Sequence, residues 1–317
     1  FLLKGEFEMN FFDIFNQVLV LFILILVGYI VTKKGMLSPH GTRDLSILVL
    51  YVTLPAMIIR SMQFDFSPEL LLSSGKMAMI AGFVYAFAIF LSYALTHILK
   101  FKGKQRDVLQ AAMIFPNVGF MGYPVVNAIY GAEGVFFASL FNIPFDIVMW
   151  TVGIHLMRRH GDSKETTYKN PLFIFLNPGT IAVTIGFTLF AFSIRLPGPI
   201  DSTLAYLASA TTPVAMITVG SILSRTEVYS IFKNSSLLIT AFIKMILIPA
   251  VLYFALGVFN MQGYFIAIPV LITAMPVAAN VAIFAVKYEN DSNTASQAVF
   301  LTTLMSILTI PIIAILI

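Results

Sequence analysis

Long apolar stretches separated by short polar ones run through almost the whole of this chain. A helix that crosses a bilayer needs about 20 mostly apolar residues. Ten stretches approach that length, although Pro55 interrupts the second one, and the sixth one is short. We therefore predict an all-α membrane protein with ten transmembrane helices, at residues 11–32, 43–61, 76–99, 107–130, 133–157, 177–194, 200–224, 235–257, 262–286 and 293–316.

Basic residues gather on one side of these ten spans. When the loops are assigned to alternating sides, 14 lysines and arginines share a side with the loop at 158–173, and the other side holds only Lys4, Arg60, Lys76 and Arg195. Cytoplasmic loops are the ones enriched in lysine and arginine. The pattern predicts a multi-pass protein of the cytoplasmic membrane with both termini outside.

Composition excludes several classes of protein. Hydrophobic residues make up 59% of the 317 and charged residues 11%, whereas a soluble domain has about 25% charged residues. The chain has no cysteine, its four histidines show no ligand spacing, and it has no phosphate-binding loop. We expect no metal, no cofactor other than a coupling ion, no nucleic-acid partner and, without a paired catalytic set in the spans, no enzyme activity.

The chain divides into two halves around its longest polar loop. We expect residues 1–9 to be a non-native or disordered leader, because the first apolar run begins directly after Met9. A first five-helix repeat follows at 10–157. Residues 158–176 are expected to be a cytoplasmic linker, and residues 177–317 a second five-helix repeat.

Matching prolines support an internal repeat. Pro55 and Pro213 stand 158 residues apart in similar segments, and Pro116 and Pro276 stand 160 apart. A nearly constant offset of half the chain indicates two related units. Because each unit has an odd number of spans, the second would enter the membrane in the opposite sense. Such inverted repeats are common in secondary transporters.

The prolines at 116 and 276 sit in segments that are poor continuous helices, IFPNVGFMGYPV at 114–125 and MPVAAN at 275–280. Paired interruptions in two inverted halves indicate a transport site near the middle of the bilayer. Helix N-termini there would attract an anion, or freed carbonyl groups would hold a cation. The alternative is that these prolines only kink their helices. The candidate substrate-binding residues are Pro116, Asn117, Gly119, Pro276 and Asn280.

Two charged residues lie within predicted spans. Asp146 is costly inside a membrane and is a candidate for binding H⁺ or Na⁺ as the coupling ion, with Asn142 one helical turn earlier on the same face. The alternative role for Asp146 is a structural carboxylate. Lys244 is expected either to extend toward the cytoplasmic end of its helix or to form a charge pair with Asp146.

The interrupted segments resemble those of a known family. PNVGFMGYPVVNAIYG at 116–131, TAMPVAANVAIFAVKYEND at 273–291 and LSILVLYVTLPAMII at 45–59 are similar to segments of the auxin efflux carrier family, and the likeness covers residues 10–317. The short loop at 158–173 resembles the bacterial branch, whose members are proposed to carry malate, malonate and related carboxylates.

The resemblance implies broken, crossing fourth and ninth helices in an architecture like that of NhaA and the bile-acid symporters. It also implies an elevator-like mechanism, a homodimer, and a small organic anion bound near Asn117 and Asn280. Plant members often have glycine–isoleucine–proline where this chain has Gly122, Tyr123 and Pro124. Tyr123 would narrow the pocket and disfavour an indole-sized ligand.

One alternative function remains open, a cation–proton antiporter of similar inverted-repeat architecture. That class is expected to carry a pair of acidic residues near the crossing, whereas Asp146 stands alone in this sequence. The sequence does not distinguish import from export, or coupling to H⁺ from coupling to Na⁺.

Overall fold

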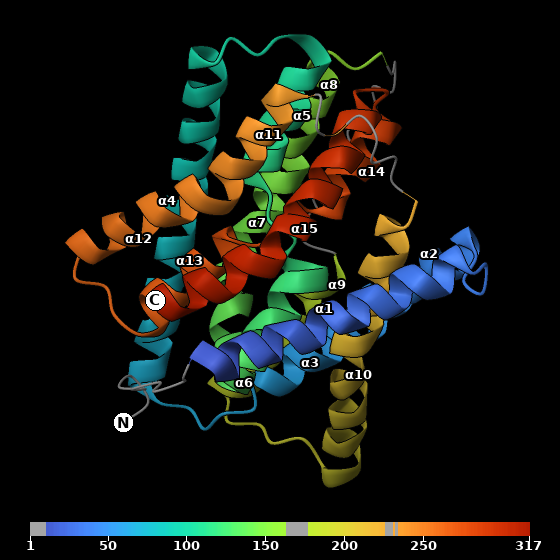
Figure 1. The fold of residues 1–317 in the computed structure, drawn as a ribbon. Helices are drawn as coiled ribbons and strands as arrows, with labels where there is room; N and C mark the ends of the chain where they lie inside the picture. Colours follow the sequence, from blue (N-terminus) through green and yellow to red (C-terminus); the bar gives the residue numbers. More distant parts are fainter. Residues whose placement is uncertain (1–10, 163–176, 226–230, 232–233) are drawn as a thin grey trace.

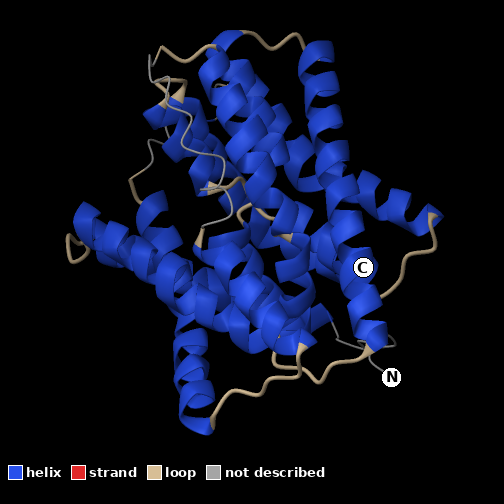
Figure 2. Cartoon of the chain, turned by 180° about the vertical axis from the view of Figure 1, so that it is seen from behind, coloured by secondary structure: helices blue, strands red, loops and turns tan. Residues whose placement is uncertain are grey.

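The computed structural model describes residues 11–162, 177–225, 231 and 234–317, and in these ranges helices joined by loops make up the fold, without strands (Figures 1 and 2). The predicted leader at 1–9 and most of the predicted linker lie outside the described residues. The α-helices are α1 (Phe11–Lys33), α2 (Pro39–Leu48), α3 (Leu54–Ser61), α4 (Pro68–Ile98), α5 (Gly103–Ile114), α6 (Tyr123–Phe141), α7 (Ile143–Val148), α8 (Ile154–Arg159), α9 (Pro178–Ala191), α10 (Gly198–Leu223), α11 (Ser235–Phe242), α12 (Ile248–Val258), α13 (Tyr264–Thr273), α14 (Ala279–Lys287) and α15 (Ser292–Leu316).

Within the described residues, four π-helical turns each run directly into the α-helix that follows them. They are η1 (Val49–Thr53), η2 (Val118–Gly122), η3 (Met149–Gly153) and η6 (Ile243–Leu247). Single π-helical turns are uncommon and occur frequently at functional sites. Here η2 directly follows the interruption at Pro116, and η6 contains Lys244.

Seven helical segments in the described chain are long and apolar enough to cross a membrane, and two shorter apolar helices, α9 and α13, accompany them. The seven segments are Ile14–Lys33, Pro39–Ser61, Pro68–Ile98, Val118–Arg159, Gly198–Leu223, Ser235–Val258 and Ser292–Leu316. The difference from the ten predicted spans has a local cause. The predicted spans at 107–130 and 262–286 are split at Pro116 and Pro276, and the one at 177–194 forms only the 14-residue α9.

The 42-residue segment Val118–Arg159 is longer than one bilayer crossing needs. Within it, Gly131 has φ of 61° and ψ of −157°, which is not a helical conformation. Glycine adopts positive φ without the steric cost of a Cβ atom. The segment therefore breaks at Gly131, between the predicted spans at 107–130 and 133–157.

Side-chain caps define where several helices begin. The Ser38 and Ser67 hydroxyls accept hydrogen bonds from the backbone N–H groups of Gly41 and Leu70, and a proline follows each serine. This is the favoured start of a helix, because the cap satisfies a free N–H and proline needs none. Asn177 caps α9 in the same way, accepting from the Thr180 N–H at 2.9 Å.

Helices α1 and α10 pack at very short range. A Cβ atom built on Gly220 would lie 1.9 Å from the Ile25 carbonyl oxygen, and one built on Gly28 would lie 2.1 Å from that of Ile217. Small residues allow such close approach between membrane helices, which gain their association energy from packing. The Thr32 hydroxyl also donates to the Ser221 hydroxyl at 2.8 Å. With α3, which packs on α10 and α9, these helices form one tightly joined group.

A buried ionic network joins α5, α8 and the turn before α15 at the end of the molecule where α4 connects to α5 (Figure 1). The carboxylate of Asp107 is fully buried and accepts from Arg159 at Nε, 2.8 Å away, and at Nη2. His160 Nδ1 lies 2.8 Å from its other oxygen. Gln110 accepts from Arg159 at 2.7 Å, and Asn290 donates to the Met157 carbonyl at 2.9 Å.

Candidate functional site

The two segments interrupted by Pro116 and Pro276 lie against each other, backbone to backbone. The Asn117 N–H donates to the Pro276 carbonyl at 2.7 Å, and the Ala278 N–H donates to the Phe115 carbonyl at 2.9 Å. Pro116 and Val277 form an isolated antiparallel bridge at this point. A backbone N–H or C=O group left without a hydrogen bond in lipid destabilises the fold by roughly several kcal/mol. Each interruption thus satisfies groups that the other leaves free.

Side chains complete this junction. The Asn117 Oδ1 atom accepts from the Phe120 N–H at 3.4 Å and caps η2. The Val277 N–H donates to the Thr302 hydroxyl at 3.0 Å, and Thr302 donates to the Ala298 carbonyl of its own helix at 2.6 Å. Thr302 was not singled out from the sequence, since a threonine in an apolar helix usually bonds only to its own backbone.

A cavity of about 180 Å³ opens beside the junction and brings together most of the predicted site residues. We call it the junction cavity. Seven of the nine candidates line it: Pro116, Asn117, Gly119, Tyr123, Asn142, Asp146 and Asn280. The remaining wall includes Leu50, Tyr51 and Leu54 from the second predicted span, Trp150, and residues 177–179 at the start of α9.

The carboxylate of Asp146 is held by hydroxyl and amide groups. The Thr180 hydroxyl donates to Asp146 Oδ2 at 2.9 Å, and the Asn177 Nδ2 group lies 2.9 Å from the same hydroxyl and donates to it. Within the described residues no lysine, arginine or histidine forms an ion pair with Asp146. Among the described residues, the carboxylate therefore lines the cavity without a counter-charge.

Asn177 and Thr180 were missed by the sequence reasoning. The Asn177–Pro178 pair is a recognisable helix start, but a local signal of this kind does not say which distant side chain the capping residues will meet. Their partner, Asp146, precedes Thr180 by 34 positions in the chain.

Two amide side chains offer hydrogen-bonding atoms to the junction cavity. The Asn142 Oδ1 atom is buried and receives no hydrogen bond within the described part of the chain. Asn280 stands in the first turn of α14, half-buried, and also lines the cavity. Amides of this kind can bind either a carboxylate through Nδ2 or a cation through Oδ1.

Two glycines of η2, Gly119 and Gly122, differ in what surrounds them. A Cβ atom on Gly119 would meet only Leu50 and Leu54 side chains, at 3.6 and 3.9 Å, which are ordinary contacts. On Gly122 it would lie 3.1 Å from Ile272 and 3.2 Å from Val118. Tight packing of η2 on α13 thus depends on Gly122, whereas Gly119 leaves room in the cavity wall.

Pro276 and Lys244 lie elsewhere. Pro276 contributes its carbonyl oxygen to the junction and does not line the cavity. Lys244 is 1% exposed in η6, which packs against α5 and α15, so it does not extend to the surface. No ion pair joins it to Asp146 among the described residues. Neither expected arrangement of Lys244 is found, because η6 faces a different neighbour from the one that Asp146 meets.

Comparison with known proteins gives consistent relatives along the whole chain. A family model described as "Membrane transport protein" matches residues 13–314. An uncharacterised transporter of Methanocaldococcus jannaschii is 26% identical over 298 residues, covering 93% of this chain and 96% of the relative. A Rhizobium meliloti protein named "Putative malonate transporter" is 23% identical over 314 residues, with 94% of each covered.

The Escherichia coli K12 transporter YfdV is a further relative, 22% identical over 305 residues, with 94% of this chain and 95% of the relative covered. These matches agree with the all-helical, multi-pass structure and with the resemblance noted in the interrupted segments. The family model spans nearly the whole chain. The chain belongs to the membrane transport protein family of auxin efflux carriers, and it is a membrane transporter by family.

Proposed function

We propose that the chain is a secondary active transporter that carries a small organic anion, malonate- or malate-like, across the cytoplasmic membrane. The observation that carries the proposal is the junction cavity. Two distant interrupted segments meet there, and Asn117, Asn280 and Asp146 line one cavity of about 180 Å³. That volume suits a small ligand, below the usual range for drug-sized molecules of roughly 300–1,000 Å³. The relative named for malonate supports the substrate class.

The same proposal includes the architecture. We infer ten spans in two inverted five-helix repeats, with α5–α6 and α13–α14 as the broken fourth and ninth helices. The backbone junction between them supports this pairing. The close packing of α1 on α10 supports a fixed group of helices against which the remaining helices, including the junction, would move in an elevator-like manner. A homodimer is part of the proposal.

Asp146 supplies a physical reason for ion coupling. A substrate carboxylate and the Asp146 carboxylate in one small cavity repel each other strongly in a medium of low dielectric constant. A proton or Na⁺ bound at Asp146 removes this repulsion, so anion and cation would bind together. This is the arrangement expected of a symporter. The alternative cation–proton antiporter would use Asp146 without an organic anion.

The test is uptake of labelled malonate into proteoliposomes, with a pH gradient imposed and Na⁺ present or absent. Asn117→Ala and Asn280→Ala should each reduce the initial rate about tenfold or more, since a hydrogen bond to a charged group contributes about 1.5–3 kcal/mol. Gln262→Ala, which removes an exposed amide outside the cavity, is the matched control. Wild-type rates in both folded asparagine variants would contradict the proposed site. Proton release driven by Na⁺ alone, without any organic anion, would favour the antiporter.

A further inference from the structure

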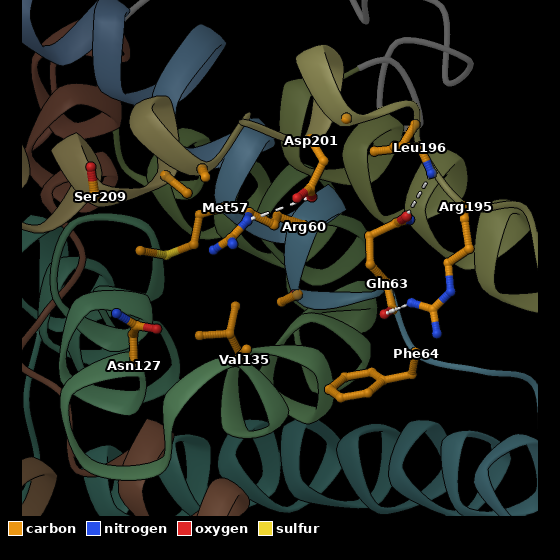
Figure 3. Close-up of a pocket in the computed structure, with 15 residues that line it drawn as sticks. Met57, Arg60, Gln63, Phe64, Asn127, Val135, Arg195, Leu196, Asp201 and Ser209 are labelled. Carbon is orange, nitrogen blue, oxygen red and sulfur yellow. Dashed lines mark hydrogen bonds and ion pairs between the residues drawn. The ribbon is translucent and has the colours of Figure 1, made fainter. Parts of the chain in front are cut away.

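A second and larger cavity, of about 630 Å³, lies between α3, α6 and α10 on the side predicted to face outward (Figure 3). We call it the outer cavity. Its wall includes the loops before α4 and α10, which lie together at the opposite end of the molecule from the α4–α5 loop (Figure 1). Nothing in the proposed junction site uses these residues.

The outer cavity and the junction cavity are neighbours along two helices. On α3, Leu54 lines the junction cavity and Met57 lines the outer cavity. On α6, Tyr123 lines the first and Asn127 the second. These pairs are three and four residues apart, and one helical turn rises 5.4 Å. On both helices, about one turn separates the two cavities.

Two arginines line the outer cavity, and their partners differ. Arg195 donates to the Gln63 carbonyl and to the Asp65 carboxylate, so its charge is compensated. Within the part of the chain that the structure describes, Arg60 has one loose ion pair, with its Nε 3.7 Å from Asp201 Oδ1. That distance exceeds the 2.7–3.2 Å of an N–H···O hydrogen bond. Arg60 therefore retains N–H donors for another acceptor.

Amide donors accompany Arg60. Figure 3 shows the Arg60 guanidinium and the Asn127 carboxamide extending toward the same open space. Asn127 is half-buried inside a membrane segment, where a polar group needs a partner. The Gln63 Nε2 atom is buried and has no acceptor among the described residues. An arginine with free donors beside amide N–H groups is a set that binds carboxylates.

We propose that the outer cavity is an oxyanion-binding site that holds a small carboxylate at the outer end of the transport path, with Arg60 and Asn127 as its ligands. This inference rests on the proposed function and adds a second substrate site to it. Asp201 competes with the ligand for Arg60 and so weakens the site. The phosphate of an anionic lipid offers the same oxyanion chemistry, and the experiment separates the two sources.

The chain has no cysteine, so one introduced thiol reports on its surroundings alone. Ser209→Cys places a thiol in the wall of the outer cavity, and Gln262→Cys places one on an exposed loop outside it. Each variant, in phosphatidylcholine proteoliposomes, is labelled with membrane-impermeant thiosulfonates that carry either a sulfonate or a trimethylammonium group. The ratio of anionic to cationic labelling rates measures the preference for anions.

We expect the ratio of anionic to cationic labelling rates to be roughly tenfold higher in the Ser209→Cys variant than in the Gln262→Cys variant, because a charged cleft concentrates counter-ions. Adding Arg60→Gln should abolish the difference, and adding Asp201→Asn should enlarge it. Lys76→Gln is the matched control, since Lys76 lies over the Phe265 ring at 4.2 Å and not in the cavity. Malonate should slow labelling at position 209 and leave position 262 unchanged.

Equal ratios at both positions would overturn the proposal. Slowing by added phosphatidylglycerol, but not by malonate or malate, would assign the cavity to lipid and also overturn it. If the proposed transport function is wrong, the experiments give a different result. In that case malonate uptake is absent, while the anion preference at position 209 and its dependence on Arg60 persist.

Discussion

At the scale of single residues, a small set of polar side chains distinguishes this chain from a generic apolar bundle. Asp146 lines the junction cavity and is bound by the Thr180 hydroxyl at 2.9 Å, with no ion-pair partner in the described chain. A membrane carboxylate in this position is costly and is a candidate for function by default. Its described neighbours bind it through hydrogen bonds and supply no opposite charge.

Replacement of Asp146 by asparagine should separate exchange from accumulation. The variant keeps the size of the side chain but cannot bind H⁺ or Na⁺ as a carboxylate does. We expect it to exchange labelled for unlabelled malonate across the membrane while failing to accumulate malonate in response to an ion gradient. Thr180→Val, which retains the carboxylate, should still accumulate malonate at a reduced rate. Full accumulation by the Asp146→Asn variant would show that Asp146 is structural.

Asp107 is the opposite case, a buried carboxylate whose charge is balanced by Arg159, with His160 beside it. Arg159→Gln would leave it buried with His160 as the one possible cation among the described residues, and breaking a buried ion pair costs about 3–5 kcal/mol. We expect a clear fall in thermal stability of the purified protein. Lys104→Gln is the control, because its pair with Asp162 is solvent-exposed and contributes about 0–1 kcal/mol. Equal stability of the two variants would contradict this assignment.

At the scale of elements, the interruptions and the glycine contacts decide how helices meet. Pro116 and Pro276 end helices early, and the freed groups pair across the junction at 2.7 and 2.9 Å. Gly28 and Gly220 bring α1 and α10 into backbone contact. The interruptions at the prolines leave a cavity with polar walls, and the glycines allow two helices to pack closely.

Gly220→Ala should force α1 and α10 apart, because the new Cβ atom would lie 1.9 Å from the Ile25 carbonyl oxygen. Neither backbone can yield without shifting a whole helix, so we expect a loss of about 2 kcal/mol or more, near the range for overpacked cores. Gly82→Ala in α4 is the matched control, since nothing lies within 4 Å of its Cβ position. That change should be neutral or slightly stabilising, as alanine favours helix. Thermal unfolding in detergent distinguishes the two, and an unaffected Gly220 variant would refute the tight packing.

At the scale of the whole molecule, two cavities stand on successive turns of α3 and α6. The smaller one lies at the junction, and the larger one on the predicted outer side. A path that connects them fits a carrier whose ligand passes from one to the other when helices shift. The side of the membrane on which each loop lies is the property to measure at this scale.

The charge asymmetry predicts which loops face the cytoplasm. In the cysteine-free chain, Lys102→Cys in the α4–α5 loop should react with an impermeant maleimide only from the cytoplasmic side, and Gln262→Cys in the α12–α13 loop only from outside. Right-side-out and inverted vesicles make the measurement. Both positions reacting from the same side would contradict the predicted count of ten spans.

Much of the molecule follows from local sequence. Apolar stretches longer than about 17 residues require membrane helices, because lipid cannot satisfy exposed backbone groups. Serine or asparagine followed by proline defines the starts of α2, α4 and α9. The prolines at 116 and 276 indicate interruptions, since proline lacks an N–H and blocks the preceding turn. Together with the charged residue inside a predicted span and the family resemblance of the interrupted segments, these signals named seven residues that line the junction cavity.

Other features depend on contacts between distant segments, and only the tertiary structure decided them. Thr180 meets Asp146 across 34 residues, Thr302 meets Val277 across 25, and Arg60 pairs with Asp201 from another helix. Lys244 is buried against α5 and α15 although a lysine could equally have reached an interface. The spacing of hydrophobic residues along the sequence specifies which face of a helix is apolar. The partner of a buried polar group is set by how the helices pack. That packing places the donors of the outer cavity together.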